Sequence, residues 1–227
     1  MIARAPALNG ASKVYILGRR KNKLEEAAAQ HEALISLQCD ITSKESLQSA
    51  VDHITEESGH LNLLVANSGI LGPASTFVPG HSVKELRKIM FEETRMEDFT
   101  KTFEVNVTAT YFSILAFLEL LDAGNKAALG GGYGEPLKQG SDFPSIQSQV
   151  IVTSSVGAFL REWACAPAYA GSKASIMHLV KHTSTGLAPH GIRVNALAPG
   201  CSFTPSLLIQ LLSPLFTSPS CEVTDVT

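Results

Sequence analysis

Short apolar runs alternate with polar, helix-forming segments along most of the chain. Apolar stretches rich in β-branched residues predict five strands, at residues 12–18, 34–40, 62–69, 149–155 and 192–200. Strong helix formers lie between them, at residues 21–31, 43–58, 96–121 and 168–188, and Ser43 stands where an N-cap is expected. Apolar strands that alternate with helices are typical of a parallel sheet covered on both faces. We therefore predict a single doubly wound α/β domain over residues 1–227.

Three stretches depart from this alternation. Residues 71–95 hold a loop with proline and glycine and then a charged helical segment, which we expect to lie over the top of the sheet. Residues 122–148 are rich in glycine and longer than an ordinary connection, so we expect a flexible surface insertion. Residues 209–227 are polar and broken by proline, which predicts an irregular tail.

Composition narrows the class of partner. The chain has 18 Lys and Arg against 21 Asp and Glu, a formal charge of −3, and this balance argues against nucleic acid or an anionic membrane. The four cysteines show no CxxC spacing, which favours reduced thiols in a reducing compartment. The apolar runs are too short for a signal peptide or a membrane span. We expect a cytoplasmic protein that acts on a small molecule.

Ligands of doubly wound sheets bind beyond the carboxyl ends of the strands, so residues there are the first candidates. Arg19 and Arg20 follow the first strand, where arginine suits the 2′-phosphate of a dinucleotide, or where two solvated arginines simply begin a helix. Asp40 follows the second strand, to bind an adenine amino group or to cap the next helix. Gly69 follows the third and allows a close approach of backbone to ligand, or a plain turn.

The later strands end in the same way. Ser154 and Ser155 follow the fourth strand, and Pro199-Gly200, with Thr204 four residues beyond, follow the fifth. In the helix between these two strands, Tyr169 and Lys173 are four residues apart and therefore share one helix face. An ammonium beside a phenol favours the phenolate and is expected to lower the pKa of the tyrosine. His178 and His182 also lie four apart, but no third ligand accompanies them, so we predict no metal site.

Taken together, these residues resemble the short-chain dehydrogenase/reductase family over about residues 1–208. The resemblance rests on Asp40-Ile41, on the N-x-G of Asn67 to Gly69, on Asn106, on a serine after the fourth strand, on the YxxxK of Tyr169 to Lys173, and on Pro199-Gly200 with Thr204. It implies a Rossmann-like fold and an NADP(H)-dependent oxidoreductase that interconverts a carbonyl and a secondary alcohol. It also implies pairing of two copies through the long helices that carry Asn106 and Tyr169.

The resemblance assigns a role to each catalytic candidate. Tyr169 is implied to donate the proton, Lys173 to hold the nicotinamide ribose, Ser155 to polarise the carbonyl, and Asn106 to support a proton relay. Ser155 is preferred to Ser154 because its spacing to Tyr169 is closer to that of the family. The cofactor-binding residues implied are Arg19, Arg20, Asp40, Ile41, Asn67, Gly69, Tyr169, Lys173, Pro199, Gly200 and Thr204.

The chain also departs from the family. The TGxxxGxG loop, which normally cradles the pyrophosphate, and the central first strand before it are not found, so we expect a chain shortened at both ends with weak cofactor binding and low turnover. The alternative to an active enzyme is a non-catalytic relative that uses the old surface for interaction. A methyltransferase is a weaker alternative, since it gives no reason for the YxxxK pair.

Overall fold

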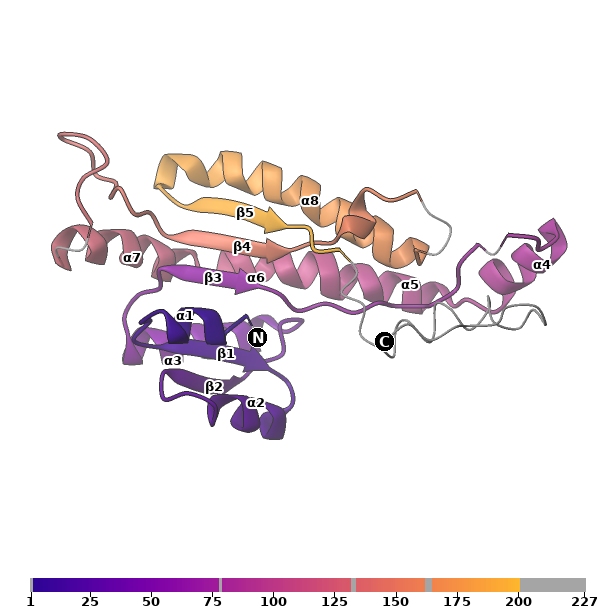
Figure 1. The fold of residues 1–227 in the computed structure, drawn as a ribbon, viewed down its shortest axis with the longest axis horizontal. Helices are drawn as coiled ribbons and strands as arrows, with labels where there is room; N and C mark the ends of the chain where they lie inside the picture. The colour runs from indigo at the N-terminus through magenta and orange to yellow at the C-terminus, as the bar shows by residue number, and fades with distance from the viewer. Residues whose placement is uncertain (1, 78, 132–133, 162–164, 201–227) are drawn as a thin grey trace, which may run out of the picture.

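The computed structural model describes residues 2–77, 79–131, 134–161 and 165–200. All five predicted strands form within these ranges, and Figure 1 shows them pointing the same way. The strands are β1 (Val14–Gly18), β2 (Leu34–Gln38), β3 (Leu63–Ala66), β4 (Gln149–Thr153) and β5 (Arg193–Leu197).

The strands form two parallel sheets rather than one. β1 pairs with β2, with Val14 opposite Leu34, and β3, β4 and β5 pair in that order. Within the described part of the chain, no strand joins β1 to β3, although the two lie side by side (Figure 1). The prediction of a parallel α/β fold is therefore confirmed.

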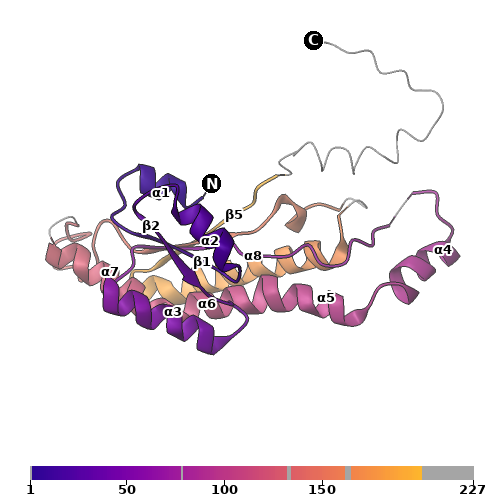
Figure 2. The same ribbon diagram turned by 90° about the horizontal axis from the view of Figure 1, so that it is seen from below.

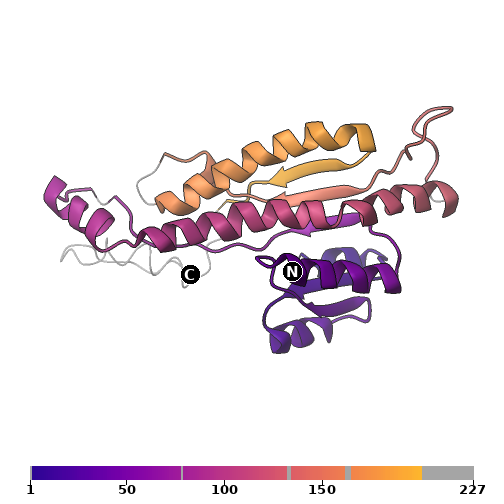
Figure 3. The ribbon, with the colours of Figure 1, turned by 180° about the vertical axis from the view of Figure 1, so that it is seen from behind.

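Helices lie on both sides of the strands, as Figures 2 and 3 show, and on one of these sides the described helices lie over β1 and β2 alone. Two short helices lie on one face, α1 (Arg4–Leu8) and α2 (Lys21–Ala28). The other face carries α3 (Lys44–Glu57), α5 (Met96–Phe103), α6 (Thr110–Ala116), α7 (Leu118–Gly131) and α8 (Pro167–Leu187). As predicted, Ser43 caps α3, accepting a hydrogen bond from the backbone N–H of Ser46 at 3.1 Å.

The packing of the two sheets differs. The three-stranded sheet and helices α6 to α8 enclose a cluster of eight buried side chains, which includes Leu121, Val150, Val152, Ile176 and Val194. Below β1 and β2, α3 and the end of α6 form a second cluster around Ile54 and Phe117. A third, small cluster of Ala7, Ala33 and Leu34 lies on the side of α1.

The helix predicted over residues 96–121 is interrupted twice. A π-helical segment, η2 (Glu104–Ala109), separates α5 from α6, and α6 ends at Phe117, whose side chain is fully buried. Among the described residues, no single helix is long and apolar enough to cross a membrane. The segments Met96–Ala116 and Leu118–Gly131 meet those criteria of length and composition only when taken together, and they are bent by 44°.

The flexible insertion expected at residues 122–148 is wrong for its first ten residues, which form the rest of α7. Gly124 was interpreted as a sign of flexibility, but a glycine is needed there for close packing, because a Cβ would overlap the carbonyl oxygen of Leu61. Asn125 is buried, accepting a hydrogen bond from the N–H of Ser148 and donating one to the carbonyl of Gly191. The tail expected at residues 209–227 lies outside the described residues.

The charged segment after residue 71 also differs from the prediction. It forms α4 (Val83–Arg87) and the π-helical η1 (Lys88–Glu92), which extend beyond the carboxyl ends of the strands instead of covering them (Figure 1). A capping box between Ser82 and Glu85 begins α4. No residue of α4 is buried, so local capping and ion pairs hold the segment rather than a core.

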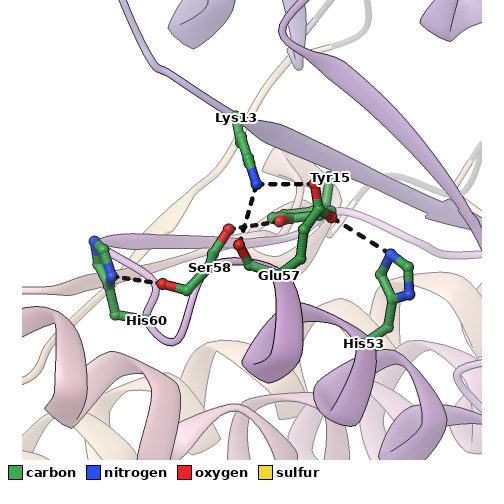
Figure 4. A network of polar contacts seen from close by, with 6 residues as sticks. All are labelled: Lys13, Tyr15, His53, Glu57, Ser58 and His60. Carbon is green, nitrogen blue, oxygen red and sulfur yellow. Dashed lines mark hydrogen bonds and ion pairs between the residues drawn. The ribbon is translucent and has the colours of Figure 1, made fainter.

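A cavity of about 640 Å³ separates β1 from β3. Side-chain contacts bridge it at the amino ends of the strands (Figure 4). Lys13 pairs with Glu57 at 2.8 Å, and the Tyr15 hydroxyl bonds the Ser58 hydroxyl at 2.6 Å. Since Ser58 leads into β3, these contacts fix the position of β1 relative to the larger sheet.

Candidate functional site

Tyr169 and Lys173 lie together on α8, one turn apart. Pro167 occupies the first turn of this helix, where its missing N–H costs nothing, so the helix begins just before the pair. The Nζ of Lys173 lies 5.7 Å from the centroid of the Tyr169 ring. The predicted proximity of the two side chains is therefore present.

The end of β4 holds Lys173 at two points. Its ammonium donates to the backbone carbonyl of Thr153 at 2.8 Å, and its own backbone carbonyl accepts from the Ser154 hydroxyl at 3.1 Å. The side chain is 5 % exposed, and this burial lowers the pKa of Lys173 because it disfavours the charged form. An ammonium has three protons, so the bond to Thr153 leaves two for other acceptors.

Ser155 and Tyr169 both lie beside Gly157. A Cβ at Gly157 would be 3.3 Å from the Oγ of Ser155 and 3.6 Å from the Cε1 of Tyr169. Ser155 precedes a short 3₁₀ turn, Val156–Ala158, and its Oγ accepts the N–H of Gly157 at 3.1 Å. This bond orients the Ser155 oxygen and leaves its O–H free to donate.

Asn106 is fully buried within η2 and connects the loop after β3 to helix α8. Its Oδ1 accepts the N–H of Ile70 at 2.8 Å, and its Nδ2 donates to the carbonyl of Ile70 at 2.8 Å and to the Ser172 hydroxyl at 3.0 Å. The side-chain amide therefore clamps the loop after β3 against α8. A π-helical segment at such a position is typical of functional sites.

Gly69 completes this group. A Cβ there would lie 3.0 Å from the Oδ1 of Asn106 and 3.5 Å from the Nζ of Lys173. Glycine thus lets the loop after β3 approach both side chains closely. The structure brings together Gly69, Asn106, Ser155, Tyr169 and Lys173.

The predicted nucleotide-binding residues lie across the cavity, at the ends of β1 and β2. Arg19 and Arg20 are exposed, and the charge of Arg19 contributes to lowering the pKa of Asp40. The larger cause of that lower pKa is local: Thr42 donates its N–H at 3.0 Å and its hydroxyl at 2.7 Å to the Oδ1 of Asp40. Asp40 therefore tightens the turn before α3, but it does not cap that helix, because Ser43 is the N-cap.

The remaining predicted residues are only partly placed at the site. Asn67, Pro199 and Gly200 are exposed at strand ends, and the carbonyl of Pro199 accepts the N–H of Val156 at 2.9 Å, which joins the ends of β4 and β5. The side chain of Ile41 packs against the cluster below β1. Thr204 lies outside the described residues.

His178 and His182 are both exposed on α8. Among the residues that the structure describes, no group of three or more His, Cys, Asp or Glu side chains could hold a metal ion.

Sequence reasoning missed two residues of the site. Ser172 accepts from Asn106 and donates to the carbonyl of Tyr169 at 2.8 Å. Its position directly before Lys173 was the only available signal. Gly157 was missed because a glycine two residues after a strand-end serine resembles any turn.

Comparisons with known proteins agree with this arrangement. A family model described as short chain dehydrogenase matches residues 1–129 and 143–207. The unmatched residues 130–142 fall within the predicted insertion and begin at the last two residues of α7.

Curated relatives are similar over most of the chain. The short-chain dehydrogenase/reductase SAT3 of Stachybotrys chartarum is 59% identical over 192 residues, which cover 84% of this chain and 70% of the relative. PhomF of Diaporthe leptostromiformis is 45% identical over 88% of this chain and 64% of its own length. The 7alpha-hydroxysteroid dehydrogenase of Escherichia coli K12 is 30% identical over 74% of this chain and 51% of its own length.

Solved structures share the fold. A short-chain type dehydrogenase/reductase from Mycobacterium marinum matches 94% of this chain and 72% of its own with a TM-score of 0.68 and 23% identity. An NAD+-bound xylitol dehydrogenase matches 92% and 68%, with a TM-score of 0.67 and 21% identity. The RhlG/NADP complex of Pseudomonas aeruginosa matches 89% and 67%, with a TM-score of 0.63 and 20% identity. At these identities the likeness concerns the fold alone.

Proposed function

The chain belongs to the short-chain dehydrogenase/reductase family, and from this premise we propose that it is an NADP(H)-dependent oxidoreductase that interconverts a carbonyl and a secondary alcohol. The observation that carries the proposal is the buried ammonium of Lys173 beside the ring of Tyr169, with Ser155 and that ring both beside Gly157. The substrate is a small carbonyl compound or alcohol, and the relatives named above support this class.

The residues present fit a nicotinamide dinucleotide. Lys173 has two ammonium protons left for ribose hydroxyls, and Gly69 keeps the space beside it free of a side chain. Arg19 and Arg20 present two guanidiniums at the end of β1, where a 2′-phosphate would give charge-assisted hydrogen bonds. The bound nicotinamide would supply the hydride to the carbonyl carbon, or accept it from the alcohol.

Tyr169 moves the proton in this scheme. During reduction its phenol O–H donates to the carbonyl oxygen as that oxygen gains negative charge, and the nearby Lys173 ammonium stabilises the phenolate that remains. The O–H of Ser155 donates a hydrogen bond to the same oxygen, since the bond that its Oγ accepts from the N–H of Gly157 leaves this proton free. Oxidation of an alcohol runs through the same groups in reverse.

We propose that Asn106 supports this chemistry through position. Its side-chain amide is committed to Ile70 and Ser172, and Ser172 in turn bonds the carbonyl of Tyr169. A change at Asn106 would therefore shift both the loop after β3 and the helix that carries the tyrosine. In that sense it supports the proton relay without carrying the proton on its side chain.

The experiment is a label-transfer assay. The chain is incubated with NADPH that carries deuterium at C4 and with a panel of cyclic ketones, aldehydes and a 7-ketosteroid, and the alcohols are analysed by mass spectrometry. We expect deuterium in at least one alcohol from the wild-type chain and a loss of about 10²- to 10⁴-fold in Tyr169→Phe. Circular dichroism of both proteins serves as the control for folding.

The gap between β1 and β3 supports a second candidate, a family member that folds but turns over little substrate. The guanidiniums that would read the cofactor and the groups that would act on the carbonyl lie on opposite sides of that gap. Deuterium transfer at no more than the rate of Tyr169→Phe would favour this candidate and contradict the enzyme.

A further inference from the structure

The turn that carries Ser155 packs directly against the residue that leads into α8. A Cβ at Gly157 would lie 3.1 Å from the Sγ of Cys165, and Gly157 itself is buried. Cys165 stands shortly before Pro167, the first residue of α8, and one helical turn before Tyr169. The serine turn and the start of the tyrosine helix therefore meet at Gly157 and Cys165.

A side chain at residue 157 does not fit into this contact. Heavy atoms in ordinary van der Waals contact are about 3.5–4.0 Å apart, so a Cβ would be too close to the Cys165 sulfur by at least about 0.4 Å. Its distance of 3.3 Å from the Oγ of Ser155 is slightly short, whereas 3.6 Å from the Cε1 of Tyr169 is ordinary contact. The sulfur is therefore the main obstacle, and glycine permits the close approach.

Both sides of the contact are tied to regular structure. The N–H of Val156 donates to the carbonyl of Pro199 at 2.9 Å, which holds the serine turn on the end of β5. On the other side, the buried Ala166 directly follows Cys165, and its carbonyl accepts the N–H of Ala170 at 2.9 Å in the first turn of α8. A displacement at the contact therefore moves either the serine turn or the start of the helix.

The distance between the two proposed catalytic hydroxyls depends on this contact. The Oγ of Ser155 accepts the N–H of Gly157 at 3.1 Å, so it moves with that glycine. Tyr169 lies in the first turn of α8, so it moves with the helix start that Cys165 precedes. Both hydroxyls are proposed to donate to one oxygen, and a misplacement of about 1 Å can lower a rate about 10²-fold.

We propose that Gly157 and Cys165 are positioning residues that together set the distance between Ser155 and Tyr169. This inference rests on the proposed function, because the distance matters for turnover only if both hydroxyls act on one carbonyl oxygen. The missing side chain on one side of the contact matches the sulfur on the other. Moving one heavy atom from the sulfur side to the glycine side conserves the total volume and should keep the fit.

A double-mutant cycle tests this match. Gly157→Ala adds one heavy atom to the contact and should lower kcat about 10- to 100-fold, with KM within about twofold of the wild type. Cys165→Ala removes one heavy atom and should lower kcat about three- to tenfold, because the serine turn is then held less closely. The double variant should recover at least about tenfold over Gly157→Ala, since its methyl group takes up the space that the sulfur leaves.

Gly186→Ala is the matched control. It makes the same change in α8, at an exposed position where nothing lies within 4 Å of the added Cβ. We therefore expect it to keep the kcat and KM of the wild type. Circular dichroism shows whether each variant folds.

A spectroscopic reading separates this inference from the proposed function, because it needs no turnover. The chain has four tyrosines, so ¹³C labelling of the tyrosine rings gives few NMR signals, and Tyr169→Phe assigns that of Tyr169. We expect Gly157→Ala and Cys165→Ala to shift this signal, and the double variant to return it toward its wild-type position. Gly186→Ala should leave it unchanged.

Two results would overturn the proposal. One is a Tyr169 signal and a kcat that stay unchanged in both single variants. The other is a double variant in which the two effects simply add, because the sulfur would then not be what excludes a side chain at Gly157.

The remaining outcomes are also decisive. A wild-type chain without turnover would contradict the proposed function, and the Tyr169 signal would then decide the positioning role by itself. If Gly157→Ala does not fold, Cys165→Ala decides the matter. A shifted Tyr169 signal in a folded Cys165→Ala supports the proposal, and an unchanged signal overturns it.

Discussion

The two sheets of this molecule have the same local architecture but different support. β4 has partners on both sides, and the helices α6, α7 and α8 bury eight side chains against its sheet. β1 has one partner and faces a cavity, and its sheet packs on a cluster of six buried residues on the side of α3 and on three, Ala7, Ala33 and Leu34, on the side of α1. The groups proposed for chemistry are on the well-supported sheet, and those proposed to select the cofactor are on the other. The groups proposed for chemistry can therefore keep their arrangement while the half proposed to recognise the cofactor is held more weakly.

Cavity-creating substitutions test this difference most strongly. Leu121→Ala, in the large cluster, should lower the free energy of unfolding by about 2–5 kcal/mol and speed amide exchange throughout the structure. Leu34→Ala, in the small cluster, should speed exchange mainly in β1 and β2 and leave the amides of Val150 and Val152 nearly unchanged. Both are measured by native-state hydrogen exchange. Equal effects of the two variants on β4 would show that the sheets unfold as one unit.

A pair of neighbouring serines sharpens the comparison within the larger sheet. Ser155→Ala should lower turnover about 10²-fold, because it removes a donor to the developing oxyanion. Ser154→Ala should lower the melting temperature slightly, since it loses one hydrogen bond worth about 1 kcal/mol, and keep most of the turnover. Steady-state kinetics and thermal unfolding of both variants provide the measurement. The reverse order of effects on turnover would make Ser154 the catalytic serine.

The smaller sheet is tested by cofactor choice. Arg19→Ala should weaken NADPH binding about ten- to hundredfold, because a charge-assisted hydrogen bond is worth about 1.5–3 kcal/mol, and should leave NADH binding unchanged. Arg193→Ala, at the exposed amino end of β5, is the matched control. Fluorescence titration with both cofactors measures the preference. Similar affinity of the wild type for NADH and NADPH would contradict the role of the arginines.

The smallest expected effect is the pH dependence of stability that comes from the buried ammonium of Lys173. The pKa of Lys173 is lower in the folded chain than the ordinary 10.5, because burial disfavours its charge. Between the two values the unfolded chain binds a proton that the folded chain does not, so the contribution of Lys173 to stability rises with pH. The melting temperature of the wild type, relative to that of Lys173→Met, should therefore rise as the pH is raised from 7.5 to 10. A difference that stays constant or falls would contradict the burial of a charged group.

The sequence was informative where local rules decide the structure. Apolar runs located all five strands, and the four-residue spacing placed Tyr169 and Lys173 on one face of α8. Ser43 was recognisable as an N-cap because that role needs only a hydroxyl before a helix. In each case the signal and its physical cause lie within a few residues of one another.

The rest depended on contacts between distant segments. Gly124 looked like part of a flexible insertion, but it packs against a carbonyl more than sixty residues earlier in the chain. The hydrogen bonds from Asn106 to Ile70 and Ser172 need a π-helical turn, which the spacing of apolar residues in the sequence does not predict. The size of the cavity between β1 and β3 also depends on contacts between distant segments. The pairs Lys13–Glu57 and Tyr15–Ser58 fix the distance across it.

The way in which Lys173 is held has a consequence for mutational robustness. Its ammonium binds the main-chain carbonyl of Thr153, an acceptor that every amino acid provides. No change of side chain at residue 153 can delete this anchor, so a random substitution there can alter packing but cannot remove the partner of the lysine. The backbone carbonyl of Lys173 instead accepts from the hydroxyl of Ser154, and a single-base change in the gene can remove that hydroxyl. Lys173 is thus held by one contact that no side-chain substitution of its partner can remove and by another that a single substitution can remove.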